Sequence, residues 1–256
     1  MMTLPHALRR WTAGMEWRRE SVGKSGAMVF RLEKGRQVQY LKVRPRDNRL
    51  EPLSREREVL RWLERRLPVP EVLDYEETRS AEFLLMSGIP GRMPMDLRVD
   101  KSRIVRWLGE GLRYIHELPP DPCPWSRPND LLVKVAAARV EKGWVDESDF
   151  DPHRRGRTAE ELLDELLRTC PREEDPVFTH GDYTLSNILM TENGISGLID
   201  WGRAAVADRY TDLAIGSRSL ASHLGSEWVP FFFKAYGLNG VNWEKLRFYR
   251  LLDEFF

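Results

Sequence analysis

Three side chains that end in oxygen ligands stand at fixed intervals in the second half of the chain. Asp182 ends a His-Gly-Asp tripeptide, Asn187 follows five positions later, and Asp200 lies thirteen positions beyond Asn187. Transfer of a phosphoryl group needs one carboxylate that receives a hydroxyl proton and oxygen ligands that hold a magnesium ion against the phosphates. The spacing is typical of the catalytic and metal-binding segments of kinases. It predicts Asp182 as the general base and Asn187 and Asp200 as ligands of Mg²⁺.

The residues around Asp182, Asn187 and Asp200 indicate whether these three have a catalytic or only a structural role. A single Asp in a loop is more often a turn former or a helix cap. Here two short apolar segments, 188–190 and 195–199, flank an Asn-Gly turn and predict a hairpin. The hairpin is expected to bring Asn187 and Asp200 to one metal site, and the Trp-Gly pair that follows Asp200 agrees with this interpretation. His180 is expected to orient the loop through hydrogen bonds, because Asp182 already serves as the base.

A lysine and a glutamate in the first third of the chain fit the nucleotide side of the same reaction. Lys42 ends a predicted strand, 37–43, where kinases place the lysine that contacts the α- and β-phosphates. Glu56 shares one face of a predicted helix with the apolar residues that follow it, whereas Glu58 points away. Glu56 is therefore the predicted partner of Lys42. Taken singly, each residue would be interpreted as a solvated surface charge.

The elements that must position these residues change character along the chain. Segments 27–32, 37–43 and 82–86 are short, apolar and typical of strands, and a helix is predicted from Ser54. After residues 87–92 the apolar residues recur at helical spacing, and Thr158 with Glu161 has the capping-box pattern. The sequence predicts an α+β fold. Its parts are a small β-rich N-terminal lobe (1–86), a hinge linker (87–92) and a larger α-rich C-terminal lobe (93–256).

Composition excludes several classes of protein. Forty basic residues balance forty acidic ones, so a strongly basic nucleic-acid binder is not expected. No apolar run has the length of a membrane span, and residues 1–19 have no signal-peptide pattern. The two cysteines, Cys123 and Cys170, have no metal-binding spacing. These features predict a soluble cytoplasmic protein without a membrane or nucleic-acid partner, and they leave its oligomeric state open.

The sequence resembles the aminoglycoside phosphotransferases, specifically the group that phosphorylates a 3′-hydroxyl (the kanamycin and neomycin kinases). The resemblance spans nearly the whole chain, and the terminal motif is the part most specific to that group. It rests on segments 39–42, 67–70, 84–87, 180–187, 199–203, 207–210 and 251–256. The resemblance implies a protein-kinase-like two-lobe fold, ATP and Mg²⁺ as cofactors, a polycationic aminoglycoside as the acceptor, and antibiotic resistance as the outcome.

The resemblance also assigns roles on the nucleotide side. Tyr40 matches the position that stacks on adenine, and Ser87 and Ile89 match the connector that offers backbone hydrogen bonds to the base. Met86, directly before that connector, is similar to members that use ATP. The loop before the first full strand is expected to fold over the phosphates, although Arg18 stands where a Walker motif requires glycine. The residues expected to act in that loop are Ser21, Gly23 and Ser25.

Two acidic segments could hold a polycation: residues 146–151 and the end of the chain, where Asp253, Glu254 and the α-carboxylate of Phe256 meet. From the residues alone, a solvated loop and a frayed tail explain them equally well. The resemblance places Asp151, Glu254 and Phe256 on aminoglycoside-contacting positions. Arg203 and Arg218 match basic positions near that pocket, with ion pairing as the alternative role.

Two departures from the family pattern weaken a pocket for a polycation. Ser219 and Ser222 stand where relatives often have acidic residues, and His-Arg-Arg at 153–155 adds positive charge directly after the acidic loop. The sequence therefore predicts either a narrower aminoglycoside profile or a different acceptor.

Three functions remain in order of preference. The first is transfer of the γ-phosphate of ATP to the 3′-hydroxyl of an aminoglycoside. The second is the same chemistry on another small hydroxyl compound, such as another antibiotic or an amino alcohol. The third is an inactive kinase fold that only binds nucleotide, which is least favoured because Lys42, Glu56, Asp182, Asn187 and Asp200 are all present. A protein kinase is not expected, since no Ala-Pro-Glu segment follows Asp200.

Overall fold

The structure is a computed structural model that describes residues 4–20, 27–46, 51–119 and 123–256. The chain forms two compact units. The first comprises Met1–Arg92, Leu189–Thr191 and Ser196–Arg203, and the second comprises Met93–Ile188, Glu192–Ile195 and Ala204–Phe256. The first unit therefore includes two segments from late in the chain, which the linear boundaries predicted from the sequence did not include. Those boundaries (1–86, 87–92 and 93–256) stay a prediction.

The first unit is built on an antiparallel sheet of five strands. Their order across the sheet is β1-β2-β3-β5-β4. The strands are β1 (Glu16–Glu20), β2 (Met28–Lys34), β3 (Gln37–Pro45), β4 (Val72–Glu77) and β5 (Ala81–Ser87). The three strands predicted from the sequence are β2, β3 and β5. Strand β1 was missed because its side chains are nearly all exposed and show no apolar alternation.

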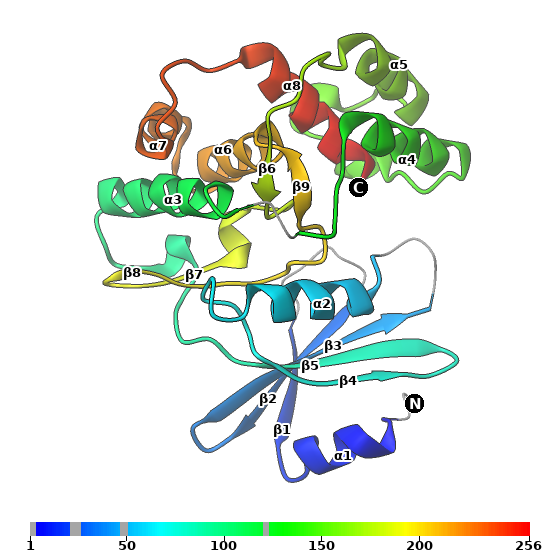
Figure 1. The fold of residues 1–256 in the computed structure, drawn as a ribbon, viewed down its shortest axis with the longest axis vertical. Coiled ribbons are helices and arrows are strands. Elements are labelled where there is room, and N and C mark those ends of the chain that lie inside the picture. Colours follow the sequence, from blue (N-terminus) through cyan, green and yellow to red (C-terminus); the bar gives the residue numbers. More distant parts are fainter. Residues whose placement is uncertain (1–3, 21–26, 47–50, 120–122) are drawn as a thin grey trace. The chain divides into compact units, whose positions relative to one another are not determined.

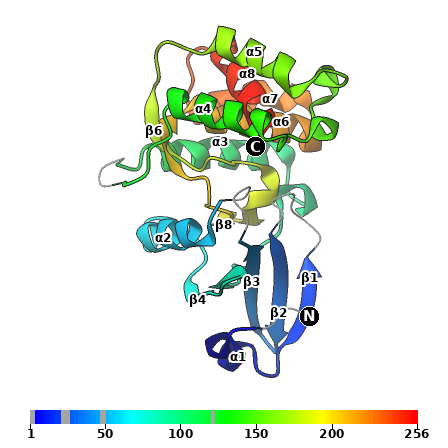
Figure 2. The ribbon, with the colours of Figure 1, turned by 90° about the vertical axis from the view of Figure 1, so that its right-hand side faces the viewer.

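The two faces of this sheet have different partners. Helix α1 (His6–Thr12) places Leu8 in a buried cluster with Leu41 and Val43 of β3. Successive side chains of a strand point to opposite faces, so Lys42 points away from that cluster. It points toward α2 (Leu53–Leu63), whose buried face includes Glu56. In Figure 1, α2 lies above the sheet and α1 below it, and Figure 2 shows the same sheet turned by 90°.

The second unit is mostly helical. Its helices are α3 (Lys101–His116), α4 (Asn129–Glu141), α5 (Ala159–Thr169), α6 (Tyr210–Leu224), α7 (Val229–Tyr236) and α8 (Trp243–Leu252). Helix α3 packs against α7, and α6 packs against α8. The first pair approaches closely at Gly109, where an added Cβ would lie 2.6 Å from Cβ of Ala235. The capping box predicted for Thr158 and Glu161 is confirmed at the start of α5.

Short elements complete the fold and include the segments of chemical interest. Strands β6 (Pro176–Thr179) and β9 (Ala205–Asp208) pair antiparallel, and β7 (Ile188–Thr191) with β8 (Gly194–Leu198) forms the predicted hairpin. The 3₁₀ helices are η1 (Pro94–Asp96), η2 (Glu147–Asp149), η3 (Pro152–Arg154), η4 (Leu185–Asn187), η5 (Ser226–Trp228) and η6 (Asp253–Phe255). The predicted α+β class is thereby confirmed.

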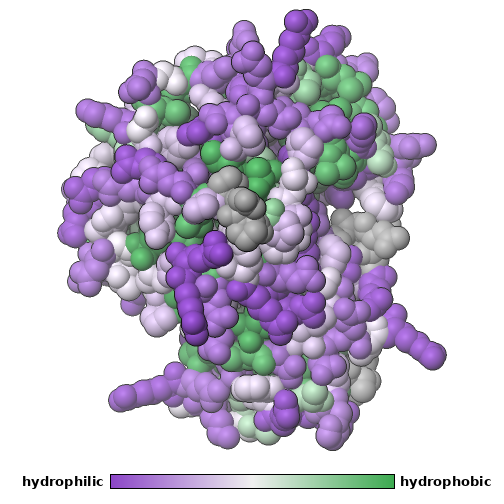
Figure 3. All heavy atoms as spheres, in the orientation of Figure 1, coloured by the Kyte–Doolittle hydropathy of each residue, from purple (hydrophilic) through white to green (hydrophobic). Residues whose placement is uncertain are grey.

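Charged residues make up 31% of the chain, and the surface is correspondingly hydrophilic. The face drawn in Figure 3 is mostly hydrophilic, with apolar side chains in scattered groups. Among the described residues, no helix combines the length and the hydropathy that crossing a bilayer requires.

Candidate active site

Lys42 of β3 lies between two carboxylates of the first unit. Its Nζ is 2.6 Å from Oε1 of Glu56, on α2, and 3.1 Å from Oδ1 of Asp200, which follows β8. Lys42 therefore pairs with Glu56, the glutamate that the helical spacing predicted as its partner. It also contacts Asp200, which lies 158 positions further along the chain. Three residues predicted for phosphate and metal binding are therefore in direct contact.

Burial makes the charges of this group interdependent. The side chain of Glu56 is 4% exposed, and an ion so buried requires a partner. Burial and the nearby charge of Asp200 raise the pKa of Glu56, while Lys42 opposes that rise. Burial lowers the pKa of Lys42, but the charges of Asp200 and Glu56 outweigh it and raise that pKa above its ordinary value. Lys42 is therefore a fixed positive charge at neutral pH.

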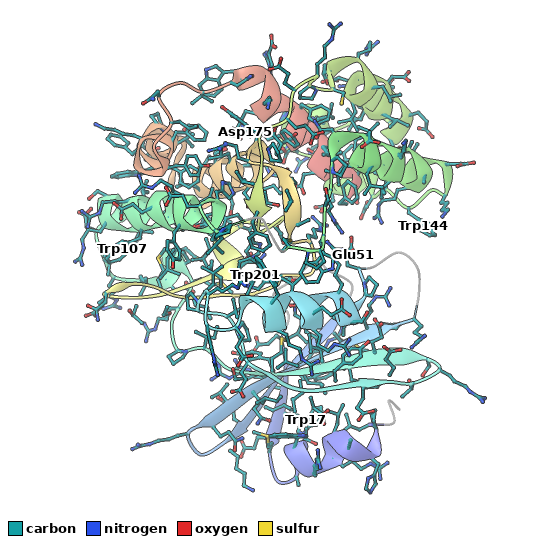
Figure 4. All side chains as sticks on the ribbon, in the orientation of Figure 1. Trp17, Glu51, Trp107, Trp144, Asp175 and Trp201 are labelled. Carbon is teal, nitrogen blue, oxygen red and sulfur yellow. The ribbon has the colours of Figure 1, made fainter. Side chains whose placement is uncertain are left out.

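The segment that begins at Asp200 is held in an unusual backbone conformation. Asp200 has a φ of 64°, in the left-handed region that side chains other than glycine seldom adopt. Next to it, Trp201 is fully buried and donates its indole N–H to the carbonyl of Leu198 at 3.0 Å; Figure 4 labels this tryptophan. Arg55 of α2 donates from Nε to the carbonyl of Gly202 at 2.9 Å. Helix α2 thus holds two successive residues of the segment: Arg55 bonds to Gly202, and Glu56 accepts from the backbone of Trp201.

The catalytic base predicted from the sequence, Asp182, lies in a loop of the second unit between β6 and η4. The side-chain amide of Asn187 donates to Oδ2 of Asp182 at 2.9 Å and to its backbone carbonyl at 3.0 Å. The backbone N–H of Asp182 donates to Nδ1 of His180 at 3.3 Å. Asp182 and Asn187, five positions apart in the sequence, are therefore joined by hydrogen bonds. Asn187 uses its NH₂ group for both bonds, and its amide oxygen takes no part in them.

A buried aspartate that the sequence analysis did not single out anchors the start of this loop. Asp212 of α6 is completely buried and accepts from the backbone N–H groups of His180 at 2.7 Å and Gly181 at 2.8 Å. It also lies 3.0 Å from Nε2 of His116 on α3. The sequence carried no local signal for this role, because Asp212 lies in the first turn of α6, where an acidic residue is common in any helix.

The two serines found at family acidic positions bond to the backbone of the second unit. Ser219 Oγ accepts from the backbone N–H of Leu185, within the loop between Asp182 and Asn187, at 3.0 Å. Ser222 Oγ donates to the carbonyl of Arg218 at 3.1 Å. Ser219 therefore supports the loop itself, a role that the sequence did not indicate.

The remaining residues predicted for the nucleotide lie in or beside the sheet. Tyr40 of β3 accepts at its hydroxyl from Nη1 of Arg31 at 3.3 Å, and the Arg31 guanidinium lies 6.0 Å from the ring centroid. Ser87 ends β5, and its N–H donates to the carbonyl of Glu71 at 2.9 Å. Ile89 lies two residues after Ser87, and its side chain packs against the backbone of β8 at Gly197. The predicted phosphate-loop residues Ser21, Gly23 and Ser25 lie outside the described residues.

Two of the predicted acceptor-binding carboxylates meet in the second unit, and an arginine joins them. The backbone N–H of Asp151 donates to Oε2 of Glu254 at 3.1 Å. Arg154 Nη1 lies 2.6 Å from Oε1 of Glu254 and 3.4 Å from Oδ2 of Asp151. Burial and the charge of Asp151 raise the pKa of Glu254, whereas Arg154 lowers it. Arg154, one of the basic residues directly after the acidic loop, therefore forms ion pairs with both carboxylates.

The other residues predicted for the acceptor divide between the two units. Arg218 of α6 forms ion pairs with Asp253 and, at 3.4 Å, with Oδ2 of Asp151. Phe256 places its ring 5.7 Å from the guanidinium of Arg139. These residues belong to the second unit, as do Asp151 and Glu254, whereas Arg203 belongs to the first.

Comparisons with known proteins agree with this chemistry. The phosphotransferase enzyme family matches residues 16–249. An aminoglycoside 3′-phosphotransferase of Streptomyces fradiae is 38% identical over 97% of this chain and 98% of its own length. The crystal structure of an aminoglycoside 3′-phosphotransferase of type VIII is 37% identical, covers 98% of this chain and 97% of its own, and superposes with a TM-score of 0.87.

A further solved relative shows the ligands of a similar protein. An aminoglycoside phosphotransferase of Streptomyces rimosus, in complex with ADP and streptomycin, is 26% identical over 97% of this chain and 95% of its own, with a TM-score of 0.81. The predicted protein-kinase-like fold is confirmed by these superpositions. The chain belongs to the phosphotransferase enzyme family and, within it, to the aminoglycoside 3′-phosphotransferases.

Proposed function

We propose that this protein transfers the γ-phosphate of ATP to the 3′-hydroxyl of an aminoglycoside and thereby confers resistance to it. The observation that carries the proposal is the bond between Asn187 and Oδ2 of Asp182 at 2.9 Å, which fixes one carboxylate oxygen of the loop. The relatives named aminoglycoside 3′-phosphotransferase support the choice of acceptor and of hydroxyl. We place the reaction in the cytoplasm, where ATP is available.

Asp182 is the general base in this proposal. Asn187 orients the carboxylate through its amide, and Asp212 holds the preceding backbone through two N–H groups. A base held from several sides reaches the acceptor hydroxyl without reorganising, which is how positioned groups accelerate proton transfer. The second carboxylate oxygen of Asp182 is the one we assign to the hydroxyl proton.

Lys42 is the charge that we assign to the α- and β-phosphates. Glu56 holds it at 2.6 Å, so that its ammonium group stays in place when a nucleotide arrives. Tyr40 points to the same face of β3 as Lys42, because the two are two residues apart on one strand. Tyr40 is therefore suited to stack on adenine, and Ser87 and Ile89 to bond its edge. Ser21, Gly23 and Ser25 are proposed to contact the phosphates through their loop.

Asn187 and Asp200 are proposed as the ligands of Mg²⁺. An amide oxygen and a carboxylate are the hard donors that this ion prefers, and it is usually held by one or two such groups together with substrate phosphates. The described residues contain no cluster of three or more His, Cys, Asp or Glu suited to hold a metal alone. When bound, the ion neutralises charge on the phosphates. Lys42 holds the carboxylate of Asp200 in place for this task, with its Nζ at 3.1 Å from Oδ1.

We assign binding of the acceptor to Asp151, Glu254 and Phe256. Arg203 and Arg218 are proposed as basic residues of the same binding site. Carboxylates of the second unit are the natural partners for ammonium groups of an aminoglycoside. A second candidate function is favoured by one observation: Arg154 and Arg218 already pair with the carboxylates of this region. That pairing suits an acceptor with less positive charge, such as another hydroxyl-bearing antibiotic or an amino alcohol.

A substrate screen tests the proposal. Purified protein is incubated with ATP and Mg²⁺ against kanamycin, neomycin and unrelated small alcohols, and ADP release is coupled to a spectroscopic assay. Mass spectrometry and ³¹P NMR then locate the phosphate. We expect turnover of kanamycin with the phosphate on its 3′-oxygen. Turnover confined to compounds other than aminoglycosides would establish the second candidate instead.

A further inference from the structure

Helix α4 lies beside the last residues of the chain. It contacts α8 and η6, the short 3₁₀ helix that ends at Phe255, and Figures 1 and 2 both mark the end of the chain next to α4. The buried residues of α4 are Asn129, Leu132 and Ala136, which recur at intervals of three and four. Arg139 continues this spacing, so it lies on the packed face of the helix.

Two hydrogen bonds join this face to the segment formed by α8 and η6. Near the start of α4, the amide oxygen of Asn129 accepts from the hydroxyl of Tyr249 at 2.7 Å. Near the end of α4, Nε of Arg139 donates to the carbonyl of Phe255. Asn129 and Arg139 are separated by about 15 Å along the helix axis, at 1.5 Å per residue. Helix α4 therefore supports residues 249–255 at two well separated points.

Arg139 has further contacts around this bond. Its guanidinium lies 5.7 Å from the ring centroid of Phe256, within the range of a cation–π contact. Its Nη2 donates to the carbonyl of Trp144 at 3.4 Å. Trp144, labelled in Figure 4, stands two residues before the acidic segment 146–151. One guanidinium therefore contacts the stretch that leads into the acidic segment and both Phe255 and Phe256.

Residues 253–256 form a single short turn that depends on contacts with the rest of the fold. A 3₁₀ turn has poorer hydrogen-bond geometry than an α-helix, and the N–H of Phe256 bonds within the turn, to the carbonyl of Asp253 at 3.2 Å. Phe255 is 1% exposed and anchors one side of the turn. Arg139 anchors the backbone of Phe255 and the ring of Phe256. A residue that is already held in place contributes more to binding, because the ligand does not have to order it.

We propose that Arg139 is a positioning residue for the acceptor: it holds Phe256 in the place from which that residue contacts the acceptor. The inference rests on the proposed function for the role of Phe256. It goes beyond that function by assigning a part in acceptor binding to helix α4. Because the nucleotide is assigned to other residues, Lys42 and Tyr40 among them, Arg139 should affect the acceptor and not ATP.

Single variants of the full chain test this inference. Arg139→Leu removes the guanidinium but keeps an aliphatic side chain on the packed face. Arg139→Lys keeps the charge and a donor without the planar fork. Lys134→Leu is the matched control: it removes one positive charge from the same helix, but its side chain is 76% exposed and pairs with Asp130. Steady-state kinetics measures kcat and the KM values for kanamycin and ATP.

The expected result is a change in one constant. Arg139→Leu raises KM for kanamycin about tenfold and leaves kcat and KM for ATP within about twofold. Arg139→Lys recovers part of this loss, and Lys134→Leu matches the unaltered protein. An unchanged or lower KM for kanamycin in Arg139→Leu would overturn the inference, and so would equal losses for kanamycin and ATP. If circular dichroism shows that Arg139→Leu is unfolded, Arg139→Gln takes its place with the same expectations.

A double variant shows whether Arg139 acts through Phe256. Phe256→Ala alone is expected to raise KM for kanamycin about tenfold, and its combination with Arg139→Leu to raise KM hardly further, because residues in contact are not additive. An increase of about a hundredfold in the double variant, the product of two independent effects, would contradict the proposed route.

Hydrogen exchange measured by mass spectrometry separates this inference from the proposed function, because it requires no turnover. Residues 253–256 are expected to exchange about tenfold faster in Arg139→Leu than in Lys134→Leu. If no aminoglycoside is phosphorylated but this segment exchanges faster, the proposed function fails and the hold of Arg139 on the segment stands. If kanamycin is phosphorylated while exchange and KM are the same in both variants, the proposed function stands and the inference fails.

Discussion

The side-chain amide of Asn187 bonds to both the carboxylate and the backbone carbonyl of Asp182, at 2.9 and 3.0 Å. One residue therefore fixes the direction of the base and the path of the loop that presents it. The amide oxygen of Asn187 keeps its capacity as a ligand, because only the NH₂ group is used for this contact. Positioning of the base and binding of a metal can thus be performed by the same side chain.

Removal of the base should abolish most of the turnover. Asp182→Ala is expected to lower kcat by at least about 100-fold, the usual contribution of a general base, with little change in KM for ATP. Steady-state kinetics measures both. Full activity in this variant would show that another group accepts the proton.

Loss of Lys42 should destabilise the fold as well as weaken nucleotide binding. Lys42→Met leaves Glu56 buried without its partner at 2.6 Å, and we expect a loss of about 3 kcal/mol in the free energy of unfolding. Adding Glu56→Gln should restore most of that stability without restoring activity. Urea denaturation measures the first effect and ATP titration the second. A double variant as unstable as the single one would contradict this account.

The contribution of Lys42 to stability should depend on pH in one direction. Its folded pKa lies above the ordinary value of 10.5, so its stabilisation is complete below that pH and is lost as the pH rises through the folded pKa. The difference in unfolding free energy between the unaltered protein and Lys42→Met is expected to shrink as the pH rises above about 10.5. A series of urea titrations across this range shows whether the difference instead grows.

Arg55 should affect the metal site through the segment it holds. Arg55→Met removes the bond to Gly202, two residues from the proposed ligand Asp200. We expect ATP with Mg²⁺ to bind about tenfold more weakly, the effect of losing one charged hydrogen bond, and ATP without metal to bind unchanged. Arg57→Met is the control, because that guanidinium lies over the ring of Tyr75, at 4.3 Å, instead. Calorimetry with and without Mg²⁺ distinguishes the two, and equal behaviour of both variants would exclude this role.

Ser219 should matter as an acceptor for the catalytic loop. Ser219→Ala leaves the buried N–H of Leu185 without its partner, which costs about 1 to 3 kcal/mol of stability. We expect a lower melting temperature and a reduced kcat. Ser219→Asp retains an acceptor at this position and is expected to keep more of the activity. An unchanged kcat in the alanine variant would remove Ser219 from the positioning of the loop.

The sequence predicted the elements and residues that depend on local patterns. Helical spacing identified Glu56 over Glu58, and the capping box placed the start of α5 at Thr158. The hairpin between Asn187 and Asp200 followed from an Asn-Gly pair between two apolar segments. Each of these patterns lies within a few residues, where periodicity and turn chemistry are decisive.

The residues that were missed depend on partners far away along the chain. Asp212 bonds to the backbone of His180 and Gly181, and Arg55 bonds to Gly202, so neither has a local signature. The pairing of Arg154 with Glu254 joins residues 100 positions apart, and only the fold shows that they neutralise each other. Composition revealed the charges, but not which of them meet.

The ion pairs beside the proposed acceptor residues have a consequence for evolution. Arg154 pairs with Glu254, and Arg218 pairs with Asp151. On the proposed assignment, the charge that an acceptor meets can therefore change through a single substitution, without a new pocket being built.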